Sequence, residues 1–240
     1  MRCFVPSRAA LLLALCCVTA AAASYAEAVD ATVQVRVTRL GKPTGQPAGS
    51  AGVAVWLTPT SPSTEDISRP KPGHYRLVQK DKKFTPHVLV IPTGSSVDFP
   101  NLDPFFHNVF SLFNGKRFDL GLYESGSTRT VHFDHDGVSY IFCNIHPEMS
   151  AVIVTLSTPY FEVSPADGSI TLHAVPPGTY EMGVWAEGSS AQDLNALSRR
   201  VVVTASQKDL GEIDVTVDTH VPAHKNKFGE DYQDPKDSLY

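Results

Sequence analysis

Cysteine is scarce in this chain, with four residues out of 240. Three of them, Cys3, Cys16 and Cys17, lie near the start, in a segment that has the features of a secretory signal peptide. Removal of that segment would leave Cys143 alone, and a single cysteine cannot form a disulfide within its own chain. In an oxidising compartment a free thiol is a liability unless something occupies it, and a metal ion is one such occupant.

Residues 1–28 are the predicted signal peptide. Two arginines precede an apolar run over 9–18, and small residues follow over 20–28, so that cleavage after Ala26 or Ala28 fits the small-x-small rule. The apolar run is shorter than the roughly 20 residues that a bilayer-spanning helix needs. We therefore expect a periplasmic or secreted protein without stable membrane insertion.

The chain also has few charged residues and little helical periodicity. Charged residues make up 19% of the chain, with a net charge of -5, which argues against a nucleic-acid binder. Apart from 191–197, which suits a short turn of helix, no long window has helical periodicity. Short β-branched runs are instead punctuated by 18 prolines and 16 glycines, which predicts an all-β fold with many turns.

The strand-like runs fall into three groups along the chain. Alternating runs over 32–38 and 52–58 precede a Pro/Ser/Thr-rich stretch over 59–72, which reads as a loop. A second group follows, at 74–79, 87–91, 95–99, 108–113, 127–133, 139–143 and 151–156. The third group lies at 160–163, 169–174, 179–186, 199–204 and 211–217, and a polar segment without periodicity comes after it.

Cys143-Asn144-Ile145-His146-Pro147-Glu148-Met149 carries the chemistry of the second group. It places a thiol, an imidazole and a thioether between two strand-like runs, so that all three would meet at one end of a β structure. Thioether sulfur is a poor ligand for zinc, calcium or magnesium, whereas two His, one Cys and a weak axial Met are the donors of electron-transferring copper. Of the nine histidines, His107 is the best placed to be the remaining ligand.

These residues give the chain a resemblance to the cupredoxins, the type 1 blue copper proteins. YIFCNIHPEM, the strand AVIVTL and the upstream FPNLDPFFHNVFS carry it, over about 75–157. The C-x2-H-x2-M spacing is most similar to amicyanin, HNVF is similar to plastocyanin, and the resemblance includes periplasmic proteins of the methylamine-utilisation type. It implies a Greek-key sandwich with one type 1 copper, held by His107, Cys143 and His146 with Met149 axial. It also implies that Asn108 ties the strand of His107 to the loop of Cys143.

The flanking segments resemble a second module, the carboxypeptidase regulatory or transthyretin-like sandwich. SPADGSITLHAVPPGTYEMGVWAEG and the opening strands carry this likeness, and neither piece alone could close a sandwich. We therefore predict one discontinuous β-sandwich over 29–73 plus 158–218, with the cupredoxin domain, 74–157, inserted in it. Residues 219–240 are predicted to be a flexible tail.

Other polar residues have plainer interpretations. The carboxylates of Asp103, Asp134, Asp136 and Glu148 are expected to be solvated charges, and no arrangement suited to hydrolysis is present. The remaining histidines are expected at the surface or without a metal partner, including the pairs His132/His135 and His220/His224, the second of which is separated by a proline.

The sequence thus predicts an exported electron carrier that cycles between Cu(I) and Cu(II) and is not an enzyme. Phe142 stands where plastocyanins usually have a tyrosine, so the edge of His146 is the expected electron exit. Redox partners would dock transiently, and the acidic balance favours a basic partner whose affinity falls with salt. The alternative is a copper carrier or regulatory binding module with a non-redox copper site. A multicopper oxidase or nitrite reductase fragment is disfavoured, because the chain has no His-x-His pair.

Overall fold

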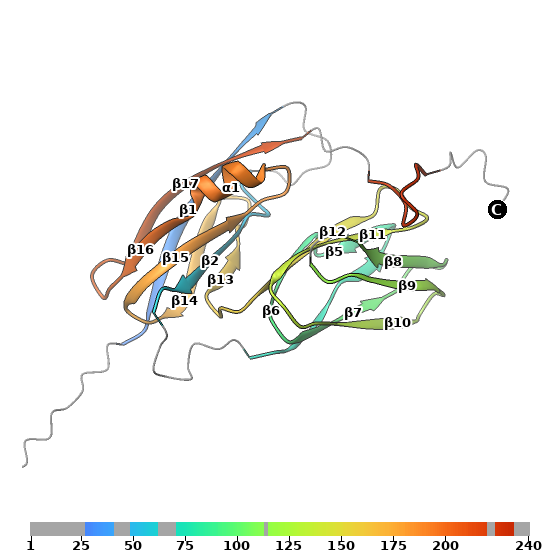
Figure 1. Cartoon of the computed structure of the whole chain (residues 1–240), viewed down its shortest axis with the longest axis horizontal. Coiled ribbons are helices and arrows are strands. Elements are labelled where there is room, and N and C mark those ends of the chain that lie inside the picture. Colours follow the sequence, from blue (N-terminus) through green and yellow to red (C-terminus); the bar gives the residue numbers. More distant parts are fainter. Residues whose placement is uncertain (1–26, 41–48, 62–70, 113–114, 220–223, 233–240) are drawn as a thin grey trace, which may run out of the picture.

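The computed structural model describes residues 27–40, 49–61, 71–112, 115–219 and 224–232. Over these residues the chain forms 17 strands and one short helix, in two β-sandwiches that lie side by side (Figure 1). The predicted all-β sandwich class is confirmed. The predicted signal peptide lies outside the described residues except for Glu27 and Ala28. No helix in the described ranges is long and apolar enough to cross a membrane.

One sandwich consists of the middle of the chain. Its larger sheet has the order β6 (Val88–Pro92), β12 (Ser150–Leu156), β11 (Gly137–Cys143), β8 (His107–Ser111) and β9 (Phe118–Tyr123). The facing strands are β10 (Thr128–Phe133), β7 (Ser95–Pro100) and β3 (His74–Arg76), with the hairpin of β4 (Val78–Lys80) and β5 (Lys83–Thr85) beside them. Alternate residues of these strands, such as Phe99, Ile141 and Ile153, form one buried apolar cluster between the sheets.

The other sandwich joins the two ends of the chain. One sheet has the order β14 (Ser169–Val175), β1 (Val29–Leu40) and β17 (Asp209–Asp218), and the other has β13 (Phe161–Val163), β2 (Ala54–Pro59), β15 (Gly178–Trp185) and β16 (Arg199–Val203). The only described helix, α1 (Ala191–Leu197), links β15 to β16 where a helical turn was predicted. Because β1 and β2 pair only with strands after residue 157, the first sandwich is inserted between the two parts of the second.

Strand β12 lies at the junction of the two sandwiches. Ala151 and Ile153 face the core of their own sandwich. Val152, Val154 and Leu156 belong to a separate apolar cluster that contains residues of the second sandwich, including Ala54 and Trp185. Burial on both faces explains why AVIVTL is a continuous apolar run rather than an alternating one.

The strand β9 was not predicted from the sequence. It lies at the edge of the five-stranded sheet, and most of its side chains are only partly buried, so its hydrophobic signal is weak. Gly121 within it has a φ of +67°, and the pairing of β8 with β9 shifts register between Asn108 and Phe110. Such a bulge interrupts the period-two alternation by which a strand is recognised.

An ion pair beside the junction makes stability depend on pH. The Nε2 atom of His87, just before β6, lies 2.6 Å from Oε2 of Glu187, just after β15, and Nδ1 lies 3.1 Å from the carbonyl oxygen of Ser150. The hydrogen bond to Glu187 raises the pKa of His87 above its ordinary value, against the opposing effect of burial. A raised folded-state pKa contributes stability that is complete below the unfolded value of about 6.5 and is lost as pH rises through the folded value.

We therefore expect the free energy of unfolding to fall between pH 6 and pH 8.5, measured by urea titration. The matched variant Glu187→Gln should lose much of this pH dependence, because His87 then has no carboxylate partner there. The His87 side chain is 37% exposed, so solvent screening keeps the effect small. An unchanged pH profile in Glu187→Gln would show that other groups cause the dependence.

Candidate metal centre

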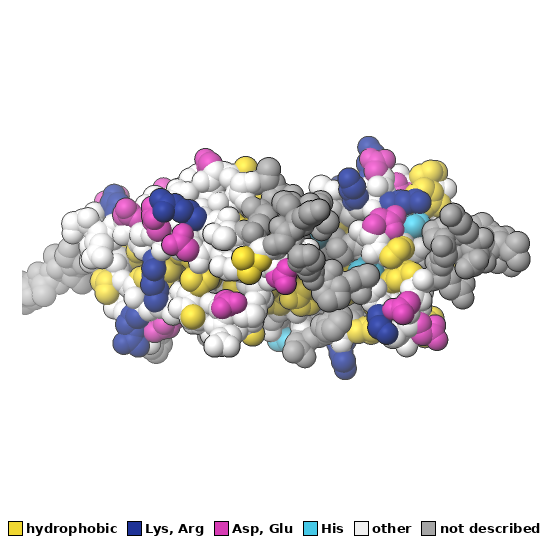
Figure 2. All heavy atoms as spheres, turned by 90° about the horizontal axis from the view of Figure 1, so that it is seen from above, with side chains coloured by type: hydrophobic (Ala, Val, Ile, Leu, Met, Phe, Trp, Pro, Cys, Tyr) yellow, Lys and Arg dark blue, Asp and Glu magenta, His cyan; other side chains and the backbone are white. Residues whose placement is uncertain are grey.

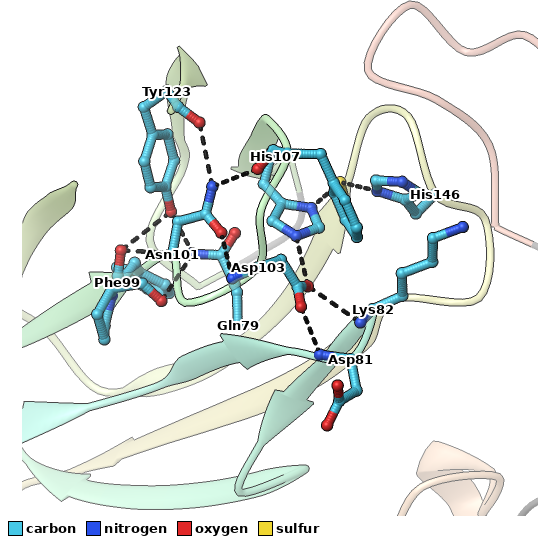
Figure 3. Close-up of polar contacts among 12 residues, drawn as sticks. Gln79, Asp81, Lys82, Phe99, Asn101, Asp103, His107, Tyr123 and His146 are labelled. Carbon is cyan, nitrogen blue, oxygen red and sulfur yellow. Dashed lines mark hydrogen bonds and ion pairs between the residues drawn. The ribbon is translucent and has the colours of Figure 1, made fainter. Parts of the chain in front are cut away.

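Three predicted ligands meet at one end of the inserted sandwich. His107 is the first residue of β8, Cys143 the last of β11, and His146 lies in the turn that leads to β12. Strands β8 and β11 are antiparallel neighbours, with Cys143 opposite Val109, so residues 36 positions apart come together. The Sγ atom of Cys143 is 3.6 Å from Nδ1 of His107 and 3.5 Å from Nδ1 of His146 (Figure 3).

These separations suit one metal ion between the three atoms. Bonds of about 2.3 Å to sulfur and about 2.0 Å to nitrogen, at angles of 110–120°, place the ligand atoms about 3.5 to 3.7 Å apart. The three ligand atoms all lie within 4.8 Å of one another. In the described part of the chain, no other group of three or more His, Cys, Asp or Glu side chains is close enough to hold a metal ion.

Met149, the predicted axial residue, is fully buried in the same apolar cluster as Cys143. Its carbonyl oxygen accepts a hydrogen bond from the N–H of Cys143 at 3.2 Å, and its own N–H donates to the carbonyl oxygen of His146 at 3.1 Å. These two bonds close the loop into a tight turn. They hold the backbone of Met149 against the backbones of Cys143 and His146.

A buried carboxylate orients His107. The Nε2 atom of His107 lies 2.9 Å from Oδ2 of Asp103, and both side chains are almost completely buried. Because a carboxylate only accepts hydrogen bonds, Nε2 carries the proton and Nδ1 keeps its lone pair toward Cys143. A metal-ligating histidine is commonly fixed by such a partner, which also raises its basicity as a ligand.

The prediction that the carboxylate of Asp103 is a solvated charge is wrong, because this side chain is buried. Its oxygens accept hydrogen bonds from the backbone N–H groups of Asp81 at 2.6 Å and Lys82 at 3.0 Å, and its own N–H donates to Oδ1 of Asn101 at 3.0 Å (Figure 3). Burial works to raise the pKa of Asp103, but the bonds from His107, Lys82 and Asp81 outweigh it and hold the pKa below its usual value. The sequence signal was the carboxylate four positions before His107.

The surroundings of Cys143 act on its thiol in two opposite directions. Burial raises the pKa of the Cys143 thiol, while hydrogen bonds from the backbone N–H groups of Ile145, Asn108 and His146 act in the opposite direction. These donors stabilise negative charge on sulfur once a metal ion has replaced the proton. Burial, together with the neighbouring His107, lowers the pKa of His146, which keeps that imidazole neutral and able to bind metal.

Asn108 joins the strand of His107 to the loop mainly through its backbone. Its carbonyl oxygen accepts a hydrogen bond from the N–H of Asn144 at 2.9 Å. Its side-chain Nδ2 points elsewhere and donates to Oδ1 of Asp119 at 2.7 Å. The link between strand and loop expected from the resemblance is therefore present, but the backbone rather than the side chain makes it.

In the described part of the chain, no other singled-out histidine or carboxylate belongs to this group of ligand atoms. The carboxylates of Asp134, Asp136 and Glu148 are exposed, as expected, and so are His132 and His135. His220 lies outside the described residues. His224 is the exception, because its ring stacks on Phe142 with centroids 4.1 Å apart.

Comparison with solved structures finds only weak structural similarity. No protein-family model matches the chain, and no curated protein does. A purple cupredoxin from Nitrosopumilus maritimus is 23% identical, over 34% of this chain and 99% of that one, with a TM-score of 0.31. A reduced Cu(I) form of an amicyanin mutant is 18% identical, over 42% of this chain and 98% of the amicyanin chain, with a TM-score of 0.33. A copper-containing nitrite reductase from Thermus scotoductus is 22% identical, over 50% of this chain and 28% of the reductase chain, with a TM-score of 0.33. Such values carry no argument about chemistry, so the case for the site rests on its own contacts.

Proposed function

We propose that this protein is an exported electron carrier that holds one copper ion in a type 1 site. The observation that carries the proposal is the donor set: two imidazole Nδ1 atoms at 3.6 and 3.5 Å from one cysteine sulfur, with a buried methionine on the same loop. A His2Cys set with a weak methionine ligand suits copper that changes between Cu(I) and Cu(II).

The chain contributes rigidity and exclusion of water to this chemistry. Asp103 fixes the ring of His107, and the backbone N–H groups of Ile145, Asn108 and His146 favour negative charge on the sulfur of Cys143. His107, Cys143 and Met149 have no exposed surface. Copper, when bound, supplies the one-electron redox change, and ligands that are held in place need little rearrangement between oxidation states. This arrangement supports a carrier of electrons, and the proposal is that the protein is not an enzyme.

The edge of His146 is the proposed route for electrons to a partner. Its side chain is only partly buried, and the ring of Phe105 contacts it with centroids 5.5 Å apart. The two loops that meet there expose Leu102, Phe106 and Ile145, at 52%, 54% and 44%. Exposed apolar side chains near an exit suit brief docking of a redox protein. Acidic and basic side chains are interspersed on the face in Figure 2, without a large field of one sign.

We expect copper-loaded protein to show an intense visible thiolate-to-copper charge-transfer band and a reversible one-electron wave in voltammetry. Zinc-loaded protein is the matched control and should show neither, because zinc has no redox change. Copper that binds without the band would contradict a type 1 site. A band combined with irreversible voltammetry, and copper transfer to a metal-free acceptor protein, would instead favour a copper carrier or a regulatory module.

A further inference from the structure

Residues 224–232 lie against the metal loop, within the segment 219–240 that the sequence predicts to be a flexible tail. The ring of His224 stacks on Phe142, with an interplanar angle of 24°. The backbone N–H of Lys227 donates to Oδ1 of Asn144 at 2.9 Å, and Nζ of Lys227 lies 2.7 Å from Oδ2 of Asp119. The segment therefore contacts the strand before the loop, the loop itself and β9.

Tyr232 makes the contact closest to the metal ligands. Its hydroxyl donates to the carbonyl oxygen of Cys143 at 2.6 Å and lies 3.1 Å from Nδ1 of His224. The segment also has its own turn, because Asn226 and Glu230 are joined by a 2.9 Å backbone hydrogen bond and Gly229 has a φ of +82°. Tyr232 is thus presented by a folded turn.

We propose that residues 224–232 form a clasp, and that Tyr232 is a positioning residue that holds Cys143 and Asn144 in their ligand-bearing conformation. Two parts of the chain hold the loop in place through hydrogen bonds. The N–H of Cys143 bonds to Met149 and the N–H of Asn144 bonds to Asn108, both within the inserted sandwich. The carbonyl of Cys143 and the side chain of Asn144 are held by the clasp.

The clasp also covers part of the metal loop. His224 covers the ring of Phe142, on the side of the chain that precedes Cys143. Ile145 and Pro147, on either side of His146, are exposed. The next step rests on the proposed function. The partly buried edge of His146 stays available to a redox partner, and the clasp determines how firmly the loop holds copper.

The test is the full-length variant Tyr232→Phe, which removes one hydroxyl and keeps the ring. One lost hydrogen bond corresponds to a change of about 2- to 10-fold in the opening equilibrium of the loop. Hydrogen exchange of the amides over 144–149 in metal-free protein should speed up by that factor, while exchange in β12 beyond Ala151 stays unchanged. Release of copper to a chelator should accelerate similarly, and the charge-transfer band of the copper protein should shift.

Asp231→Asn is the matched control. Asp231 belongs to the same segment, but its side chain is 91% exposed, and its Oδ1 atom makes only a long, weak ion pair of 3.8 Å with Nζ of Lys225. Its replacement should therefore leave loop exchange and copper release as in the parent protein. Unchanged loop exchange in Tyr232→Phe, or exchange that rises equally in all strands, would overturn the clasp. Faster loop exchange in a protein that never gives the charge-transfer band would support the clasp and refute the copper function, so the two proposals fail separately.

Discussion

Replacing Cys143 by serine should abolish the visible charge-transfer band of the copper-loaded protein. The band requires a thiolate bound to copper, and Cys143 is the only cysteine in the described ranges. A hydroxyl oxygen is a harder donor than a thiolate and keeps its proton at neutral pH, so the site would also lose its preference for copper. Absorption and electron paramagnetic resonance spectra of the two proteins at equal copper content provide the measurement.

Met182→Leu is the control for this variant. Met182 is a fully buried sulfur residue in the core of the other sandwich, and leucine has nearly its volume. That variant should keep the complete band. If copper-loaded Cys143→Ser still had the band, the sulfur ligand would have to come from elsewhere in the chain, and the proposed site would be wrong.

The ligand loop could be predicted because its chemistry is local. Cys143 and His146 are three residues apart between two strand-like runs, so a turn alone brings their side chains together. His107 is 36 residues from Cys143, and it was predicted from the resemblance of its segment, FPNLDPFFHNVFS, to the cupredoxins. Local spacing therefore predicted the ligand loop, and the resemblance supplied the distant histidine.

Asp103 and Tyr232 could not be placed in this way. A carboxylate is solvated unless the fold supplies donors for it, and the donors of Asp103 include the backbone N–H groups of Asp81 and Lys82, on a turn 22 and 21 residues away. Tyr232 reaches Cys143 across 89 positions through a single hydrogen bond, from a polar segment with no periodicity. Such contacts leave no repeating pattern in the sequence, and they become visible only once the sandwich is built.

Asp103→Asn should weaken copper binding by about 10- to 100-fold, the usual cost of removing the partner of a metal-ligating histidine. Asparagine has the shape of aspartate but offers one acceptor oxygen and two N–H donors. Oδ2 of Asp103 accepts from both Nε2 of His107 and the N–H of Lys82, whereas Oδ1 accepts from the N–H of Asp81. An amide oxygen in the place of Oδ2 turns the NH2 group toward the N–H of Asp81, and an amide oxygen in the place of Oδ1 turns it toward His107 and Lys82. Either orientation loses at least one hydrogen bond, and a neutral amide oxygen is a weaker acceptor than a carboxylate, so His107 is held less firmly in its present tautomer and orientation. Competition with a copper chelator measures the affinity.

The same substitution at Asp98 separates this effect from the loss of a charge alone. Asp98 lies on β7 and accepts a hydrogen bond from Thr130 at 2.7 Å, without contact to a predicted ligand. Asp98→Asn should therefore bind copper as the parent protein does. Equal affinities for all three proteins would show that Asp103 serves only the local fold of the turn at Asp81 and Lys82. A selective loss in Asp103→Asn would instead place the buried carboxylate among the groups that determine how tightly the metal is held.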